Sequence, residues 1–472
     1  MSKQLNMKGT TAFLPKSQSV VIQALDNVLD PFTIDKDAKS VNVKPVKELN
    51  TGINSNIEIP FVEWGIGNDL PIKIIKRIQD NIQLGANTNY NVLTGYGQGI
   101  MVVKKVKVNG KVEYEEQLES EQPAIYEFLE NNNYERIIYD SILDLDMFSR
   151  SYRELIFSRE NKLVRIAHKE ASYSRVSQMN EKSKIEYHGY NYQWHKRNLN
   201  TVSVTKLLDE ECPQTDLKIR RGKLPGTDGK SQIEKDTFRY ILPLGLPTPA
   251  RVYYPNPFYW SVFRMGWDQI ANVIPKYKTT LMRNKIQVPY IVYISESFWE
   301  KLYMWENASD DDKKKEGRKK FLKQLDEFLA GAENAGKAFV TEFVYNNHTG
   351  SEMKDIVIEP LKKSGSATEG GDWIEDNEEA TNMICLAKLN HVSLIGAAPG
   401  KNSKINGTEA RELFIIKQAM MQPIRNELVK DLYMAKYFNG WDRDLHFIIP
   451  NIELTTLDKG TGAVKSIGSQ AI

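Results

Sequence analysis

The stretch "LIGAAPGKNSKINGTEARELFIIKQAMMQPIRNEL", residues 394–428, joins a glycine-rich polar loop directly to a long amphipathic helix. A phosphate-binding loop of the G-x-x-x-x-G-K-[ST] type needs four spacer residues, so that its backbone N–H groups surround the phosphates, and a hydroxyl for Mg²⁺. Here Gly396 and Gly400 enclose three residues, and Asn402 follows Lys401 where the hydroxyl belongs. An amide is a weaker Mg²⁺ ligand in this position. The loop therefore does not predict nucleotide binding, and another role must account for it.

The segment after the loop has the periodicity of one long helix. Asn406 or Thr408 can cap its start, and glutamates in its first turns suit the positive end of the helix dipole. Pro423 lies inside it, so a kink is expected there. The apolar residues recur at helical spacing: Leu413, Ile416, Met420, Ile424, Leu428 and Leu432.

A second helical segment, "YYPNPFYWSVFRMGWDQIANVIPKYKTTLMRN", covers residues 253–284. Pro275 is expected to kink this helix. Its apolar residues recur at alternating steps of three and four, the spacing of a seam along which helices pack lengthwise: Trp260, Phe263, Trp267, Ile270, Ile274, Tyr277 and Leu281. Periodicity alone fits an ordinary core helix of a single chain equally well.

Between these two helical segments the sequence predicts a small α/β insertion. A strand over 285–294 precedes a helix capped by Ser295, and the charged run 310–331 reads as a further helix. Because acidic residues sit among the basic ones in this run, a solvated helix face is favoured over a nucleic-acid patch. Two strands follow, then a flexible joint, "KSGSATEGG", and a returning helix over 372–391.

The first half of the chain predicts an α+β domain behind a polar lead-in. Asn109-Gly110 is a strong turn signal for a hairpin over 102–117. Residues 201–236 have few apolar anchors and predict a long surface loop. The segment "DLHFIIPNIELTTL" near the C-terminus predicts a strand that returns to this domain.

Composition excludes several classes of function. The chain has 472 residues, with 63 Lys plus Arg against 61 Asp plus Glu, and this formal charge of +2 is unlike that of a protein gripping nucleic acid over its whole surface. Cys212 and Cys385 are far apart and the six histidines lack ligand spacing, so no disulfide, metal or cofactor is predicted. No apolar run approaches the ~20 residues of a membrane span. A reducing cytosol suits this chain.

The order of these parts is more specific than any single motif. A helix, a compact insertion containing "GAENAGK", a returning helix, a glycine loop and a helix with a central proline follow one another. In this order the sequence resembles the portal proteins of tailed bacteriophages, most clearly over residues 256–435. The segments "WGIGNDLPIKIIKRIQDN" and "ILDLDMFSRSYRELIFSRENKLVRIAHKE" extend the resemblance more loosely over most of the chain.

The resemblance implies an α+β portal fold with wing, helical stem, α/β clip, tunnel loop and long kinked wing helix. Since only residues 437–472 follow that helix, the crown of larger relatives is expected to be reduced or absent. The implied divisions are a partly disordered N-terminal arm (1–55), the wing (56–255), a first stem helix (256–284), the clip (285–365), a hinge and second stem helix (366–393), the tunnel loop (394–407), the wing helix (408–436), and a C-terminal strand and tail (437–472).

The resemblance also implies roles for particular residues. The tunnel loop would meet DNA phosphates in the channel through Lys401, Asn402, Lys404 and Asn406, with freedom of the backbone at Gly396, Gly400 and Gly407. The stem would bury Trp260, Phe263, Trp267, Ile270 and Ile274 against neighbouring subunits. The clip would contact the motor or an adaptor through Lys313, Lys314, Lys315, Arg318, Lys319 and Lys320.

The implied function is structural, with no catalytic residue, metal or cofactor. Typically twelve copies form a ring at one capsid vertex, through which double-stranded DNA passes during packaging and ejection. The implied partners are other copies, DNA, the terminase large subunit, the major capsid and scaffold proteins, and head-completion adaptor or tail proteins. The expected location is the virion, after assembly in the host bacterial cytoplasm, without contact with a membrane. The alternatives are another head-tail connector or minor capsid protein, a nucleotide hydrolase using the loop, and a loop that is only a flexible surface connection.

Overall fold

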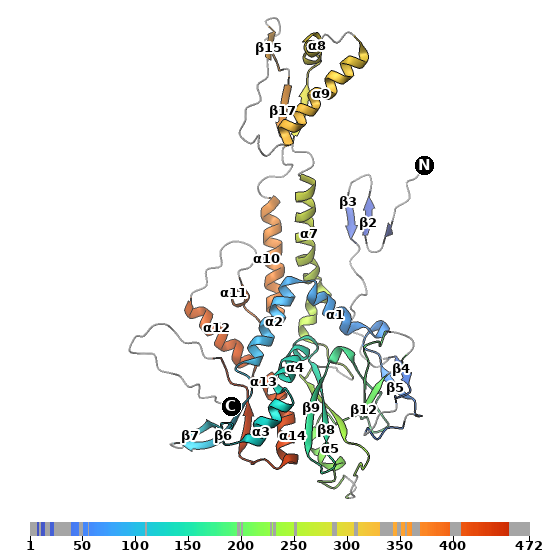
Figure 1. Cartoon of the computed structure of the whole chain (residues 1–472), viewed down its shortest axis with the longest axis vertical. Helices are drawn as coiled ribbons and strands as arrows, with labels where there is room; N and C mark the ends of the chain where they lie inside the picture. Colours follow the sequence, from blue (N-terminus) through green and yellow to red (C-terminus); the bar gives the residue numbers. More distant parts are fainter. Residues whose placement is uncertain are drawn as a thin grey trace, which may run out of the picture. The chain divides into compact units, whose positions relative to one another are not determined.

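The structure is a computed structural model that forms two compact units (Figure 1). The first comprises Met1–Asn272 and Ile374–Ile472, and the second comprises Val273–Trp373. The residues that the structure describes are 7–8, 11–14, 19–22, 39–46, 51–54, 56–108, 111–195, 199, 202–226, 229, 233–249, 253–285, 290–305, 310–330, 343–346, 351–354, 356–360, 369–396 and 407–452.

A six-stranded sheet organises the first unit, with the strand order β10-β11-β12-β13-β8-β9. Neighbouring strands are antiparallel except β12 and β13, which are parallel. The bounds are Arg150–Phe157 (β8), Leu163–Lys169 (β9), Ser174–Val176 (β10), Tyr187–Tyr190 (β11), Ser203–Leu207 (β12) and Arg239–Gly245 (β13). Nearly every residue of β8 is buried, which is what a central strand covered on both faces requires.

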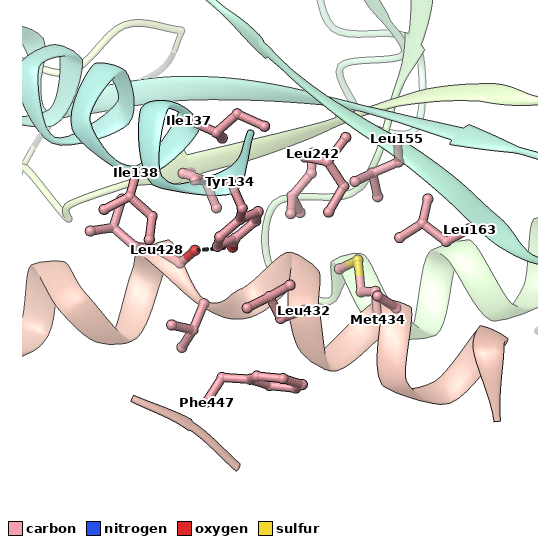
Figure 2. Packing of buried hydrophobic residues seen from close by; sticks show 14 of the residues in the cluster. Tyr134, Ile137, Ile138, Leu155, Leu163, Leu242, Leu428, Leu432, Met434 and Phe447 are labelled. Atoms are coloured by element: carbon pink, nitrogen blue, oxygen red, sulfur yellow. Dashed lines mark hydrogen bonds between the residues drawn. The ribbon is translucent and has the colours of Figure 1, made fainter. Parts of the chain in front are cut away.

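Helices and the C-terminal segments cover this sheet, and one apolar core joins them (Figure 2). Ile138 of α4 (Tyr134–Phe148), Leu155 of β8 and Leu432 of α14 (Lys430–Asn439) are fully buried in it. The neighbouring helices are α1 (Leu70–Gln79), α2 (Ile82–Tyr96), α3 (Pro123–Asn131) and α5 (Pro213–Arg220). Residues far apart in the sequence thus share one core.

A buried ion pair crosses the same core. Arg153 Nη1 lies 2.5 Å from Asp431 Oδ2, and neither side chain is exposed. Tyr134 donates its hydroxyl to Asp431 Oδ1 at 2.6 Å, and Arg153 also donates to the carbonyl of Leu428 at 2.6 Å. The pair is therefore hydrogen-bonded on both sides, and removal of either partner would leave an uncompensated charge in the core.

Three smaller sheets of the first unit can be compared with the elements predicted from the sequence. β6 (Met101–Val108) and β7 (Lys111–Glu116) form the predicted hairpin, and β18 (Leu445–Ile448) pairs with β6, so the returning strand is also confirmed. β4 (Ser40–Val43) pairs with β5 (Ile59–Val62), so part of the segment expected to be an arm belongs to the folded body. Ahead of it, β1 (Met7–Lys8), β2 (Thr11–Leu14) and β3 (Ser19–Ile22) form a sheet of their own.

The expectation of a long surface loop over 201–236 is wrong. β12 and α5 lie in this segment, and Leu217 of α5 is fully buried in the core. A strand bonded on both edges and a few buried apolar side chains order a segment whose composition is mostly polar. These side chains are Val202, Val204, Leu207, Leu208 and Leu217.

The helix expected over 256–284 is interrupted. A 3-10 turn (Phe258–Trp260) leads into α6 (Ser261–Met265), and α7 (Trp267–Lys285) begins after Gly266. Gly266 has a φ of 77°, a left-handed conformation that glycine adopts without steric cost and that ends α6. Pro275, in contrast, lies inside α7 without ending it.

The single wing helix expected over 408–436 is divided into α12 (Gly407–Met420), α13 (Gln422–Leu428) and α14. Pro423 lies in the first turn of α13, where its missing N–H costs nothing. The proline thus begins a new helix instead of kinking an old one. A second break at Val429 lets Asp431 reach Arg153.

The second unit contains the predicted α/β insertion. β14 (Tyr290–Ile294) pairs with β17 (Ile356–Pro360), and β15 (Phe343–Asn346) pairs with β16 (Ser351–Lys354). Ser295 caps α8 (Glu296–Trp305) as expected, because its hydroxyl accepts from Phe298 N at 3.2 Å. The charged run forms α9 (Asp311–Ala330), whose Phe321 contacts the rings of Phe298 and Trp299.

Candidate functional site

The glycine loop itself falls on residues 397–406, which lie outside the described residues. This applies to Gly400, Lys401, Asn402, Lys404 and Asn406. The described flanks are α11 (Val392–Ile395), which ends at Gly396 with a φ of 146°, and α12, which starts at Gly407. The described geometry is therefore that of the base of the loop.

A buried lysine fixes one side of this base. Lys388 follows α10 (Glu369–Ala387) and donates to Asp146 Oδ2 at 2.7 Å. The same ammonium lies 3.6 Å from the centre of the Tyr259 ring. Asn91 donates to the other carboxylate oxygen of Asp146 at 2.7 Å. The end of α10 is thereby tied to α2 and α4 by charge-assisted hydrogen bonds, which are about twice as strong as neutral ones.

A second buried lysine fixes the other side. Lys417 of α12 donates to the carbonyls of Leu389 at 3.3 Å and Lys388 at 3.5 Å. Burial lowers the pKa of Lys417 to about 8, with the charge of Lys388 acting in the same direction and Asp146 opposing it. The carbonyls at the end of a helix carry partial negative charge, so a cation is well placed here. Both flanks of the loop are thus clamped to each other and to the core.

The sequence did not lead us to Lys388 and Lys417 as the residues that clamp the flanks of the loop. Lys388 lies four residues after the buried Ile384, and Lys417 four residues after Leu413, so both lysines continue an apolar stripe of their helix. A lysine that lies on the apolar side of a helix is a sequence signal that could have predicted their burial. Their common neighbour Asp146 lies some 240 residues earlier than Lys388, and no local pattern could have paired them.

The five stem residues that were expected to pack against neighbouring subunits differ in their burial. Trp260 and Phe263 are only 2% and 4% exposed in the chain's own core, and Trp267 packs on the same cluster. The Trp260 indole and the Tyr259 hydroxyl both donate to the carbonyl of Met147. Ile274 of α7 is buried as well. Trp260, Phe263 and Ile274 are thus enclosed within their own chain, and the expected packing of the stem residues against neighbouring subunits stays a prediction.

Ile270 behaves differently, since it remains 40% exposed. Val273 and Tyr277, each 44% exposed, continue its row along α7. Further large apolar side chains are exposed near the base of the loop: Met383, Leu386, Leu389, Ile415, Ile416 and Met420. These side chains are apolar surface that the chain itself does not bury.

The clip cations are not equivalent. Arg318 lies over the rings of Trp299 and Tyr303 and 3.5 Å from Glu296, so it joins α9 to α8. Lys314 lies over the ring of Tyr303. Among the described residues, Lys313 and Lys319 are exposed and form no ion pair. Lys315 approaches Asp312 at 3.9 Å, and Lys320 has further interactions within the chain.

One constellation has the residue types of a hydrolytic triad. His168 Nε2 lies 3.2 Å from Asp144, and its Nδ1 lies 3.4 Å from Ser141 Oγ. Ser141 is fully buried and its hydroxyl oxygen accepts from Arg153 Nε, so no substrate can reach it. Burial raises the pKa of Asp144 to about 6, against the opposing effect of His168. The arrangement ties α4 to β9 and has the character of core polar bonding.

In the part of the chain that the structure describes, no group of three or more His, Cys, Asp or Glu side chains is arranged to hold a metal ion. No helix in the same residues combines the length and apolar character needed to cross a membrane.

Comparison with solved structures finds a chain of similar fold in the virion of the native gene transfer agent (GTA) particle. The two match with a TM-score of 0.50 over 82% of this chain and 84% of that chain, at 11% sequence identity. This protein has the fold of a virion protein. Similar chains also occur in the neck of the empty GTA particle computed with C6 symmetry (TM-score 0.49, 12% identity, 82% and 85% of the two chains) and in the neck of the native particle computed with C12 symmetry (0.48, 11%, 80% and 84%). No protein-family model and no curated protein matches the sequence.

Proposed function

We propose that this chain is a portal protein, which forms a ring at one capsid vertex and provides the channel for packaging and ejection of double-stranded DNA. The observation that carries the proposal is the fold shared with a virion protein over four-fifths of both chains. The order of helix, α/β insertion, returning helix, loop and proline-containing helical segment supports it independently, because a short adaptor would not contain this order.

In this proposal the parts of the chain take separate tasks. Residues 56–255 and 408–436 form the wing, 256–284 and 366–393 the stem, and 285–365 the clip. The clip faces the terminase large subunit and later the head-completion or tail proteins, with Lys313 and Lys319 as the cations most available for contact. The ring assembles in the host cytoplasm with the scaffold and major capsid proteins and remains in the virion.

Residues 394–407 form the tunnel loop, and its clamped base gives it a physical rationale. Lys388 ties the segment before the loop to Asp146, and Lys417 ties the helix after the loop to the carbonyl of Leu389. Lys401 and Lys404 of each copy would then form a belt of positive charge that contacts the phosphates. Such contacts carry no sequence information, which suits a conduit through which DNA must slide.

The first experiment is the mass and shape of the purified protein. Light scattering should give a mass many times the 54.1 kDa of one chain, and negative-stain electron microscopy should show a ring with a central hole. A chain that remains a monomer at high concentration and inside assembled capsids contradicts the proposal.

The tunnel loop has its own test. The double variant Lys401→Ala with Lys404→Ala should assemble like the wild type but package or retain DNA several-fold less well, because the belt of charge is lost. Lys76→Ala with Lys182→Ala, at two exposed lysines of the first unit, is the matched control. Unchanged packaging in the loop variant would contradict the DNA contact while leaving the ring intact.

A further inference from the structure

The helix α12 has the reverse arrangement of an ordinary surface helix. Lys417 and Gln418, in its last turns, are only 5% and 3% exposed. Ile415 and Ile416, directly before them, are 54% and 56% exposed. Surface helices normally turn their apolar stripe to the core and their polar residues to water. Within the described part of the chain, α12 therefore has two buried polar side chains and an uncovered apolar side.

The uncovered side continues toward the end of the helix. Ala419 and Met420 are exposed as well. Of residues 413–420, only Lys417 is charged, and its side chain points into the protein. Apolar side chains exposed together in this way mark a surface that another segment or another chain covers.

The last described residue of the chain is bound to this same helix. The backbone N–H of Ile452 donates to Gln418 Oε1 at 2.6 Å, and Gln418 Nε2 donates to the carbonyl of Ile452 at 3.1 Å. One buried side-chain amide thus bonds both backbone groups of Ile452, as a paired residue of a neighbouring strand would. Residues 453–472 follow and lie outside the described residues. Their point of attachment to the body of the protein is therefore α12.

A contact with α13 gives the direction in which the chain reaches α12. Arg425 of α13 is buried and donates to the side-chain carbonyl of Asn451. Asn451 is thus held by α13 and Ile452 by Gln418 of α12, so the chain runs from α13 toward the start of α12. Chain ends are usually poorly ordered unless they are tied down. Two buried polar side chains used for this purpose point to a role for the residues that follow.

We propose that the uncovered side of α12 is the docking surface of residues 453–472 of the same chain. The first apolar residues of that segment, Leu454 and Leu457, follow the anchor closely. Because the segment is attached at the surface, its effective concentration there is on the order of millimolar, and no second molecule has to be recruited. The docked segment would hold the helix that follows the loop. The inference concerns a single chain and does not depend on the proposed ring.

The distances along the chain allow this contact. Leu454 is two residues beyond Ile452, which is a reach of about 7 Å in an extended chain. Ile415 is three residues before Gln418, which is about 4.5 Å along the helix. The first apolar side chain after the anchor can therefore cover the exposed isoleucine nearest to the anchor.

Disulfide cross-linking in the full chain tests the contact directly. The exposed Cys212 is replaced by serine in every variant, and the buried Cys385 is kept. Under oxidation, I415C with L454C should form a cross-link within one chain about tenfold faster than I72C with L454C, because docking raises the local concentration of the two thiols. Ile72 is the matched control, since it is also an exposed isoleucine of the first unit but lies on α1.

The mass of the cross-linked product shows whose segment occupies the surface. A link within one chain leaves the mass of a monomer, whereas a link between copies doubles it. If I415C and L454C on separate chains cross-link as fast on mixing as they do within one chain, a second copy covers α12 and the inference is overturned. A rate no higher than that of the control with I72C would overturn it too.

Oxidation of methionine by peroxide gives an independent measurement, because it follows the exposure of the sulfur. Met420 lies on the proposed surface, and Met304 of the second unit serves as a reference in the same molecule. L454D should raise the oxidation rate of Met420 several-fold and leave that of Met304 unchanged, since a charged side chain does not stay on an apolar surface. S469D, which adds the same charge farther along the segment, should change neither rate. Thermal unfolding checks that both variants keep the fold, and an unchanged Met420 rate in folded L454D would contradict docking.

Discussion

The inner and outer rows of the segment from Phe258 to Lys285 share one sequence pattern and have opposite environments. Trp260 and Phe263 are enclosed by the core of their own chain, whereas Ile270, Val273 and Tyr277 are exposed. Trp260, Phe263, Ile270 and Tyr277 belong to the same seam of steps of three and four, and Val273 lies beside it. Gly266 ends α6 in a left-handed conformation, so the two enclosed residues precede it and the three exposed residues lie on α7.

This difference shows that periodicity identifies an apolar stripe without identifying what covers it. A stripe covered by its own chain contributes to the stability of the monomer. A stripe that stays exposed contributes to association instead. Unfolding measures the first effect and assembly measures the second, so the two can be separated by experiment.

The largest expected effect is on the inner row. Trp260→Ala should lower the free energy of unfolding by about 3–5 kcal/mol, the usual result of removing a large buried aromatic side chain. Phe258→Ala is the matched control, because Phe258 lies two residues away and is 72% exposed; we expect less than about 0.5 kcal/mol there. Denaturant unfolding of both variants gives the comparison. Equal losses would mean that Trp260 is not part of the monomer's core.

A smaller effect concerns the clamp at the base of the loop and depends on pH. The pKa of Lys417 is lowered from 10.5 to about 8 in the folded chain. Between these values the unfolded chain holds a proton that the folded chain has released, so stability from this group rises with pH across the window. The gain between pH 7 and pH 10 should be on the order of 2 kcal/mol larger in the wild type than in Lys417→Met.

This measurement requires unfolding curves of both proteins at several pH values. Lys76→Met, at an exposed lysine, controls for the loss of one positive charge and should leave the pH dependence of the wild type unchanged. An identical pH dependence in the Lys417→Met variant would show that Lys417 is not held in a desolvated position.

The smallest effect on stability belongs to the outer row. Ile270→Ser should change the free energy of unfolding by less than about 1 kcal/mol, because the side chain is already partly in water. The fraction of protein in rings should nevertheless fall about tenfold, as truncation within an apolar contact weakens every junction. Ile72→Ser, at an isoleucine of similar exposure on α1, should alter neither quantity. A large loss of stability with normal assembly would place Ile270 in the core instead.

Local signals predicted several elements correctly. The Asn109-Gly110 turn, the cap at Ser295, and the strands at 290–294 and 445–448 depend on neighbours in sequence, and the structure contains each of them. The predictions were wrong where residues far apart in sequence determine the local structure. The segment 201–236 is ordered by pairing of β12 with β11 and β13, and the break between α13 and α14 lies at Val429, close to the Asp431 that pairs with Arg153. The candidate loop was recognisable, while its clamp was not.

Residues close together along the chain set the periodicities, the turns and the order of elements that resembles a portal protein, so these features could be read without a structure. The tertiary structure was needed to show which apolar stripe is enclosed and which is exposed, and that Lys388 and Lys417 share the neighbourhood of Asp146. Burial and electrostatic pairing depend on which segments meet in space. Residues far apart in sequence supply those partners, so no local pattern carries the information.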